Sequence, residues 1–541
     1  MTPGNSAGKA AVEAPEFPAS STSYDEVPYK SYPYPQTRPE RLATVAAIFG
    51  LKTAPVDRCR VLELGSSSGG NLIPAAEQLA ESQFVGIDAS SREIADGQAI
   101  VQRLGLRNIR LERRNILDIT ADFGQFDYII AHGVYSWVPN AVQEKLLEVC
   151  RANLAPNGVA YVSYNTYPGW HMRGIIRDMM CYRAQAFQKP ADQIRQARAL
   201  IEFLAQSVPK EDNAYGIMLR NELNAMRGKE DHYLFHDHLE KVNEPVYFHQ
   251  FMDRAQAKGL QYLGEAEFGS MSLKNFSQQI EAVVQSVASN LIEIEQYMDF
   301  VRNRMFRQTL LCHADVALDR SVSPDRVLGL YVASPAKPES PVTDVKTSAK
   351  VVFKGPHAVT TTTDPLMKAA MLHLGAIWPQ YVAFPELVAT ARSRINPEPA
   401  VVDTAQITAD SRKLAEPLLR CYASNQVELS VRAAPYTLQP SERPVGPPSA
   451  RLQVEASNRA TNFRHESVQL NDLQRQVLRC LDGQHDRAAI LEFLQDLCLR
   501  GVLVVHEHGQ AVKDATQIKG ILEKPLDAAL TMLGRLAMLR A

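Results

Sequence analysis

The sequence predicts an α/β protein whose first domain is a doubly wound sheet, followed by smaller mixed α/β domains. Five short apolar runs alternate with helix-like segments between residues 60 and 164, at the spacing that is typical of parallel strands joined by helices. A glycine-rich turn follows the first run, which indicates close backbone approach at the carboxyl end of that strand. The chain of 541 residues is too long for a single core, so we expect several domains.

The elements of the first domain follow in order. Residues 29–35 alternate tyrosine with proline, which excludes a helix or central strand, so this segment should drape over another part of the molecule. Residues 38–51 have helical periodicity, and three long helical segments after residue 166 indicate a helical insertion, either a regulatory element or a lid, over about 173–257. We expect strands at 60–64, 83–88, 109–113, 126–131, 158–164, 260–264 and 307–312.

The later part of the chain shows its boundaries by composition. Stretches rich in proline and serine at 333–341 and 434–449 are typical of linkers and bracket a middle domain. The middle and last domains alternate helices with strand-like runs, including a predicted strand at 502–505, which gives both a winged-helix-like character. We divide the chain into a disordered tail (1–23), a sheet domain (24–320), a middle domain (321–433), a mobile linker (434–463) and a C-terminal domain (464–541).

Composition and charge exclude some classes of function. The chain is 45% hydrophobic and 22% charged with a formal net charge of −2, so no global attraction to nucleic acid is expected. The 7 cysteines are scattered without a CxxC pair, which favours a reducing cytoplasm over a disulfide framework. No apolar run of about 18 residues occurs, so we expect no membrane span. The oligomeric state cannot be read from the residues.

The glycine-rich turn carries the strongest functional motif. Glu63, Gly65, Ser67 and Gly69 follow at two-residue spacing, which resembles motif I of class I S-adenosylmethionine-dependent methyltransferases with serine in place of the middle glycine. The resemblance implies a Rossmann-like methyltransferase sheet with S-adenosylmethionine at this turn. Asp88 ends the second predicted strand, where the ribose hydroxyls need an acceptor.

The third predicted strand is followed by candidate residues for the adenine. Asn115 takes the position where the methyltransferase family usually carries an acidic residue, and Ile116 follows it. An amide oxygen can still accept a hydrogen bond from the adenine amine. Asp118 is the alternative acceptor, and the sequence leaves the choice between Asn115 and Asp118 open.

Polar and aromatic residues follow the fourth predicted strand. His132, Tyr135 and Trp137 are the candidate catalytic residues, and His132 is also a candidate contact of the cofactor. Aromatic side chains there would form a water-poor funnel in which an amine meets a sulfonium. The alternative is that Trp137, like Trp170 after the fifth strand, only fills space in the core.

The four histidines at 232, 236, 238 and 249 are candidate ligands of a metal ion. No cysteine joins them, and the carboxylates nearby belong to an ordinary helix start and turn, so we expect no metal. A lid over the cofactor is the preferred interpretation of this segment.

Longer motifs make the resemblance specific. The segments 32–44, 61–72, 132–139 and 164–172 closely resemble bacterial methyltransferases with a methyltransferase regulatory domain, whose best-known members methylate lysines of outer-membrane proteins. The likeness extends from Tyr24 to about His313. It implies methyl transfer from S-adenosylmethionine to a protein lysine. A small-molecule N- or O-methyltransferase and a catalytically weak regulatory protein remain as alternatives.

Overall fold

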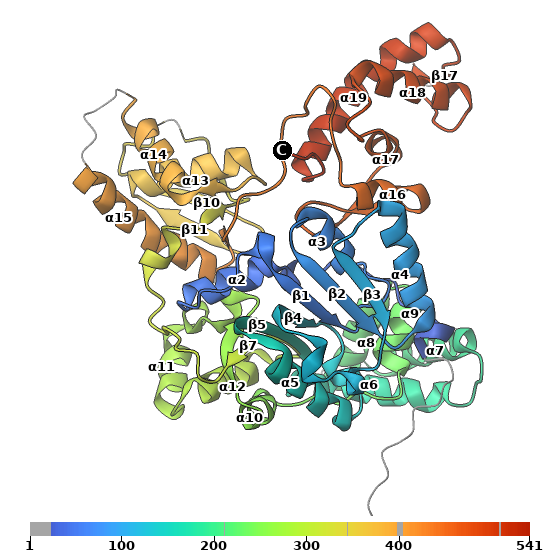
Figure 1. Cartoon of the computed structure of the whole chain (residues 1–541), viewed down its shortest axis with the longest axis vertical. Coiled ribbons are helices and arrows are strands. Elements are labelled where there is room, and N and C mark those ends of the chain that lie inside the picture. The colour runs from blue at the N-terminus through green and yellow to red at the C-terminus, as the bar shows by residue number, and fades with distance from the viewer. Residues whose placement is uncertain (1–22, 210, 212, 343, 398–403, 508–509) are drawn as a thin grey trace, which may run out of the picture.

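The computed structural model describes residues 23–209, 211, 213–342, 344–397, 404–507 and 510–541. A central sheet lies between a middle domain on one side and a C-terminal domain that extends away from it, with a helical insertion below (Figure 1). The predicted tail over 1–23 lies outside the described residues except for Ser23, which begins α1 (Ser23–Glu26). In the part of the chain that is described, no helix is long and apolar enough to cross a membrane.

The central sheet has seven strands in the order β3-β2-β1-β4-β5-β7-β6. All seven predicted strands are confirmed, because strands buried on both faces appear in sequence as continuous apolar runs. The parallel arrangement predicted from the five runs between residues 60 and 164 is confirmed for β1 to β5. The sheet is mixed, because β7 runs antiparallel to β5 and β6. The strands are β1 (Arg60–Leu64), β2 (Gln83–Asp88), β3 (Ile109–Arg113), β4 (Phe126–Ala131), β5 (Leu154–Asn165), β6 (Leu260–Glu265) and β7 (Phe306–His313).

The direction of β7 follows from its connection. The helices α11 (Gln278–Val287) and α12 (Leu291–Arg302) join β6 to β7. Phe306 at the start of β7 pairs with Asn165 at the end of β5. Phe306 therefore lies at the edge where β1, β2, β4 and β5 end, which is where the glycine-rich turn was predicted to bind its ligand.

Helices cover both faces of the sheet. One face packs against α2 (Pro39–Ile48), α3 (Leu72–Gln78) and α4 (Ser91–Leu104), and its core continues into the middle domain. The other face packs against α5 (Asn140–Asn153) and α10 (Phe248–Ala257). The buried residues of the two cores are distinct, and the partly buried Met271 packs against both.

The helical insertion has its own small core. It comprises α6 (Gly169–Ala184), α7 (Pro190–Ser207), α8 (Ala214–Met226), α9 (Asp231–Leu234) and the π-helix η6 (Phe235–Leu239). Buried side chains from these helices, such as Ile201 and Leu219, pack together. The predicted boundaries 173–257 are wrong at the far end, because Phe248 and Phe251 of α10 are buried in the core of the sheet.

The described residues of the middle domain form two three-stranded sheets and three α-helices. Its sheets have the orders β11-β10-β9 and β12-β8-β13. Residues of α13 and α14 belong to the same core as α2 of the sheet domain. The elements are β8 (Tyr331–Ala333), β9 (Lys337–Pro338), β10 (Val351–Lys354), β11 (Val359–Thr362), α13 (Pro365–Ile377), β12 (Val382–Ala383), α14 (Phe384–Ile395), α15 (Thr404–Ala423) and β13 (Glu428–Ser430).

The predicted linker 434–463 is wrong as a mobile segment. Ala450 and Val454 of α16 (Pro448–Ala456) and Ala460 of β14 (Arg459–Thr461) are buried in the core of the C-terminal domain. The prolines mislead because Pro448 occupies the first turn of α16, where proline favours a helix. The C-terminal domain therefore begins before residue 464.

The rest of the C-terminal domain follows the prediction with one shift. The strand expected at 502–505 is instead found at β16 (His506–Glu507), paired with β17 (Gln510–Ala511). The remaining elements are β15 (Ser467–Gln469), α17 (Asp472–Arg479), α18 (Arg487–Leu499) and α19 (Ala515–Arg535). The β14–β15 hairpin has its turn at residues 462–466.

Candidate active site

The glycine-rich turn is held by its backbone. The N–H groups of Gly65 and Ser66 both donate to the carbonyl of Ile87 on β2, at 2.9 Å each. Gly65 has φ +76°, and a Cβ added there would lie 2.5 Å from Cγ2 of Val134. Ser67 has φ +48°, so this serine adopts the left-handed backbone that a glycine would adopt more easily. The turn therefore keeps the shape of motif I despite the substitution.

Gly69 and Gly70 are glycines for different structural reasons. Gly69 has φ +76°, which is costly for any residue with a Cβ. A Cβ on Gly70 would lie 2.5 Å from the backbone oxygen of Ser31, whose hydroxyl accepts a hydrogen bond from the Gly70 N–H at 2.8 Å. Gly70 therefore serves the close passage of the N-terminal segment over the turn.

Glu63 is a buried carboxylate with one free oxygen. Its side chain is 3% exposed, and Oε1 accepts a hydrogen bond from Nδ2 of Asn71 at 2.8 Å. Oε2 is buried without a partner. Burial raises the pKa of Glu63 to about 8, and the negative charge of Asp88 adds to this increase. A buried carboxyl oxygen without a partner needs one, and a polar group of a ligand at this turn would supply it.

Asp88 lies at the end of β2 beside the turn. Its Oδ2 accepts a hydrogen bond from the Ser67 N–H and its Oδ1 one from the Ser90 N–H, both at 2.9 Å. Burial raises the pKa of Asp88, and these backbone hydrogen bonds lower it. Each carboxylate oxygen can accept a further bond, so the side chain is fixed in place and still able to receive ribose hydroxyls.

The N-terminal segment 23–37, called the strap below, lies over the turn. This placement agrees with the prediction that the tyrosine-proline segment drapes over the molecule. His236 of η6 holds the strap through Nε2, which lies 2.7 Å from the Val27 carbonyl oxygen. Further hydrogen bonds join Asp25 to Ser90, Tyr29 to Glu93, Ser31 to Gly70 and Tyr34 to Asn71. The strap and η6 are thus joined by a hydrogen bond, and a lid role for the histidine-rich segment stays a prediction.

His132 lies at the end of β4, half-buried against the strap. Its Nδ1 lies 2.9 Å from the Tyr161 hydroxyl and 3.3 Å from the Ser163 hydroxyl. The ring of Tyr34 packs on the imidazole with the ring centroids 3.9 Å apart, and Phe306 approaches at 6.2 Å. Burial lowers the pKa of His132 to about 4, so the ring is neutral at physiological pH. This neutral aromatic group suits a site where a sulfonium and an amine meet.

The prediction that Tyr135 faces an acceptor is wrong in this fold. Its side chain is 0% exposed, packs in the core of the α5 and α10 face, and receives a hydrogen bond from Arg254 at 3.3 Å. The 3-10 turn η5 (Tyr135–Trp137) advances by about a third of a turn per residue, so neighbours in sequence point in different directions. Trp137 is half-buried and meets Trp170 edge to face at 6.2 Å.

The adenine candidates remain a prediction. Asn115 caps the short helix η3 (Ile116–Asp118), because its Oδ1 accepts the Leu117 N–H at 3.0 Å. Ile116 is half-buried and Asp118 is exposed. The geometry does not choose between Asn115 and Asp118.

The four histidines take structural partners. His238 lies 2.9 Å from Glu222, and His249 lies 3.0 Å from Gln296. Within the ranges that the structure describes, no group of three or more His, Cys, Asp or Glu side chains could hold a metal ion.

Arg307 is a buried cation that sequence reasoning missed. Its guanidinium donates to Asp299 at 2.7 Å, Glu265 at 2.7 Å and Glu295 at 3.0 Å, and lies 3.7 Å over the ring of Phe248. All three carboxylates and Arg307 are buried. This network joins β6, α12 and β7 and fixes the start of β7 beside the site. Nothing in the local sequence distinguishes Arg307 from a surface arginine.

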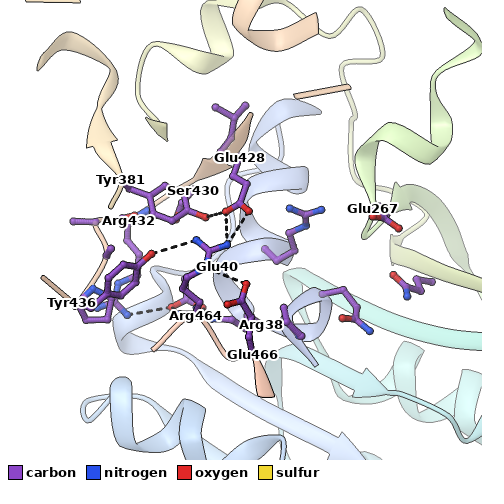
Figure 2. A pocket seen from close by; sticks show the side chains of 18 residues that line it. Arg38, Glu40, Glu267, Tyr381, Glu428, Ser430, Arg432, Tyr436, Arg464 and Glu466 are labelled. Carbon is purple, nitrogen blue, oxygen red and sulfur yellow. Dashed lines mark hydrogen bonds and ion pairs between the residues drawn. The ribbon is translucent and has the colours of Figure 1, made fainter. Parts of the chain in front are cut away.

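A polar cavity of about 310 Å³ lies where the strap, the middle domain and the C-terminal domain meet (Figure 2). Ion pairs cross it, with Arg464 at 2.8 Å from Glu428 and Arg432 at 3.3 Å from Glu40. Arg464 comes from the turn of the β14–β15 hairpin and Glu428 from β13. The cavity is a junction of domains, and the residues of motif I do not line it.

Three family models match the chain. A methyltransferase domain matches residues 62–160, a predicted methyltransferase regulatory domain matches 230–313, and the C-terminal winged helix domain of PKMT matches 442–538. The regulatory match covers β6, β7 and their helices, and only partly overlaps the predicted insertion 173–257. The winged helix match begins inside the predicted linker, in agreement with the packing of α16.

One relative and one solved structure match nearly the whole chain, and a second relative matches less than half of it. The uncharacterized protein RP789 of Rickettsia prowazekii is 36% identical over 513 residues, which cover 93% of this chain and 91% of that protein. The uncharacterized protein RP028 of the same organism is 39% identical over 241 residues, which cover 44% of this chain and 96% of that protein. The solved structure of PKMT2 from Rickettsia typhi in complex with AdoHcy superposes with a TM-score of 0.84 at 28% identity and covers 95% of this chain and 100% of that chain.

These matches agree with the geometry. A motif I turn, an acidic residue at the end of β2 and the strand order of the sheet occur together in one chain with both accessory domains. The chain belongs to the family of S-adenosylmethionine-dependent methyltransferases that carry a methyltransferase regulatory domain and a C-terminal winged helix domain.

Proposed function

We propose that this enzyme transfers a methyl group from S-adenosylmethionine to the side-chain nitrogen of a lysine in a protein. The observation that carries the proposal is the match to PKMT2, a protein lysine methyltransferase, across all of its domains. The accessory domains support a large acceptor, because they add surface far from the chemistry. We also propose a cytoplasmic location, since all seven cysteines are free thiols.

We propose that residues of the turn and of the strand ends hold the cofactor. The shape of the turn at Gly65, Ser67 and Gly69 leaves room for close backbone approach, and a Cβ on Gly133 after β4 would meet nothing within 4 Å. Glu63 offers its free Oε2 and Asp88 offers both oxygens to hydroxyl or amine donors. Asn115 or Asp118 would accept from the adenine amine, with Ile116 against its ring. The bound cofactor supplies an electrophilic methyl group on a sulfonium.

We propose that the residues around His132 receive the acceptor. A lysine with an ordinary pKa of about 10.4 must lose its proton before it can attack, and removal from water lowers the pKa of an ammonium group. Tyr34 and Phe306 pack beside His132 and provide aromatic surface for this purpose, and the neutral His132 adds a hydrogen-bonding nitrogen without charge. Trp137, which packs against Trp170, is kept as a further candidate for the acceptor site. In-line geometry then accounts for most of the rate.

The test uses the whole protein with isotope-labelled S-adenosylmethionine and a bacterial protein extract. Mass spectrometry of digested acceptors should find labelled methyl groups on lysine. The matched control is Asp88→Ala, which should fold and lose transfer together with cofactor binding. Label found only on small molecules would replace the protein acceptor by a small amine or hydroxyl. Cofactor binding without any transfer would favour a catalytically weak regulatory protein.

A further inference from the structure

The turn of the β14–β15 hairpin reaches into the sheet domain. Between Asn462 and Glu466, the carbonyl of Phe463 accepts a hydrogen bond from Arg38 at 3.2 Å. The next residue but one, His465, places Nε2 at 2.8 Å from Oδ1 of Asn71 in the glycine-rich segment. His465 is 1% exposed and Asn71 is 4% exposed. The C-terminal domain thus contacts, inside the protein, the residue that holds Glu63.

The donors and acceptors around Asn71 form one consistent pattern. Its Nδ2 donates to Oε1 of Glu63 at 2.8 Å and to the hydroxyl of Thr37 at 2.9 Å. The Thr37 hydroxyl in turn donates to the carbonyl of Tyr34 at 2.9 Å. Oδ1 of Asn71 accepts from the Tyr34 N–H at 2.9 Å. His465 must therefore donate from Nε2, because Oδ1 has no proton to give.

This pattern fixes which side of the Asn71 amide faces Glu63. With Oδ1 held by His465 and the strap, the NH₂ group is directed at Oε1 of Glu63, and Oε2 is left without a partner. The contact has a cost, because His465 has φ +64° and its Nδ1 is buried without a partner. A strained backbone and an unpaired polar atom persist only where the surroundings hold them, and such features cluster at functional sites.

We propose that His465 is a positioning residue through which the C-terminal domain completes the cofactor site: it orients Asn71, and Asn71 presents Glu63 to the ligand. The proposal rests on the proposed role of Glu63 in cofactor binding. It differs from a docking role for the C-terminal domain, because it concerns the affinity for the cofactor with no acceptor present. His465 acts through Asn71 and contacts neither the cofactor nor the acceptor.

The experiment measures binding of S-adenosylhomocysteine to the full chain by titration calorimetry. His465→Ala should weaken binding roughly tenfold, which corresponds to about 1.4 kcal/mol. His465→Gln should restore most of the affinity, because the Gln amide can donate to Asn71. The matched control is His485→Ala, which removes a half-exposed histidine bonded to Asp482 within the C-terminal domain and should leave binding unchanged.

Thermal unfolding of the unliganded variants separates positioning from packing. A purely structural role would lower the melting temperature of His465→Ala and leave its affinity equal to that of the unmodified protein, and this result would overturn the proposal. If His465→Ala does not fold, His465→Asn replaces it, because asparagine tolerates the left-handed backbone and is too short to reach Asn71. Unmodified protein that binds no S-adenosylhomocysteine would instead refute the proposed function.

Discussion

Glu63 should make the unliganded protein less stable as the pH rises, and Glu63→Gln should remove this dependence. In the folded protein its carboxyl has a pKa of about 8, because of burial and the nearby charge of Asp88. In the unfolded chain the pKa returns to its ordinary value of 4.5. Since the folded pKa is raised, the stabilising contribution of the neutral carboxyl is fully present below pH 4.5 and is lost as the pH rises through 8.

The size of the effect follows from the two pKa values. Each pH unit between them is worth about 1.4 kcal/mol, so the full displacement is on the order of 5 kcal/mol. Between pH 5 and pH 9 the free energy of unfolding of Glu63→Gln should gain roughly 4 kcal/mol relative to the unmodified protein. At pH 5 the variant should be less stable by about 1 kcal/mol, because its buried NH₂ group brings two N–H donors to a place where the neutral carboxyl brings one O–H.

The assay is urea denaturation of both unliganded proteins at five pH values, followed by tryptophan fluorescence, since Trp137 and Trp170 lie in the sheet domain. The exposed Glu202→Gln on α7 serves as the control and should follow the unmodified protein at every pH. Parallel pH profiles for the unmodified protein and Glu63→Gln would refute the raised pKa of Glu63. The same variant should bind S-adenosylhomocysteine more weakly, and equal binding would refute the proposed role of Glu63.

Three further substitutions test the fold and the site. Gly65→Val should abolish S-adenosylhomocysteine binding by calorimetry because of its clash and its positive φ, whereas Gly174→Ala, which meets open space, should not. Arg307→Leu should lower the free energy of unfolding in urea by about 3 to 5 kcal/mol by stranding buried carboxylates, whereas the exposed Arg487→Ala should cost below about 1 kcal/mol. Tyr135→Phe should change the initial rate of methyl transfer less than about twofold. A larger loss would show that the Tyr135 hydroxyl takes part in the reaction.

The sequence was sufficient for much of the fold because the central strands β1, β2, β4 and β5 are largely buried and therefore appear as apolar runs. It could not give the direction of β7, since that depends on the three-dimensional path of α11 and α12. It could not show that residues 434–463 are packed, because composition does not report contacts. Prolines there suggested mobility, whereas Pro448 begins a helix whose Ala450 and Val454 are buried.

Some residues of the candidate site could also be predicted from the sequence, and others could not. The placement of Glu63, Gly65 and Asp88 around one turn could be predicted, because a motif and a strand end are local features. Trp137 and Tyr135 could not be separated, since the 3-10 turn between them decides which face each one meets. His465 gave no signal, because its partner Asn71 is 394 positions away in the sequence.

The packing of the C-terminal domain changes how its role can be tested. Removal of residues 464–541 would leave α16 and β14 without the core that buries them, and would delete His465 with the rest of the domain. Cofactor binding and acceptor docking would then fall together, and neither loss could be assigned. A truncation that ends before Tyr436 removes α16 and β14 as well, so no part of the C-terminal core is left exposed. This truncation still removes His465. Substitution of exposed apolar side chains of this domain, such as Leu499 and Val504, keeps His465 in place and so reports on acceptor docking by itself.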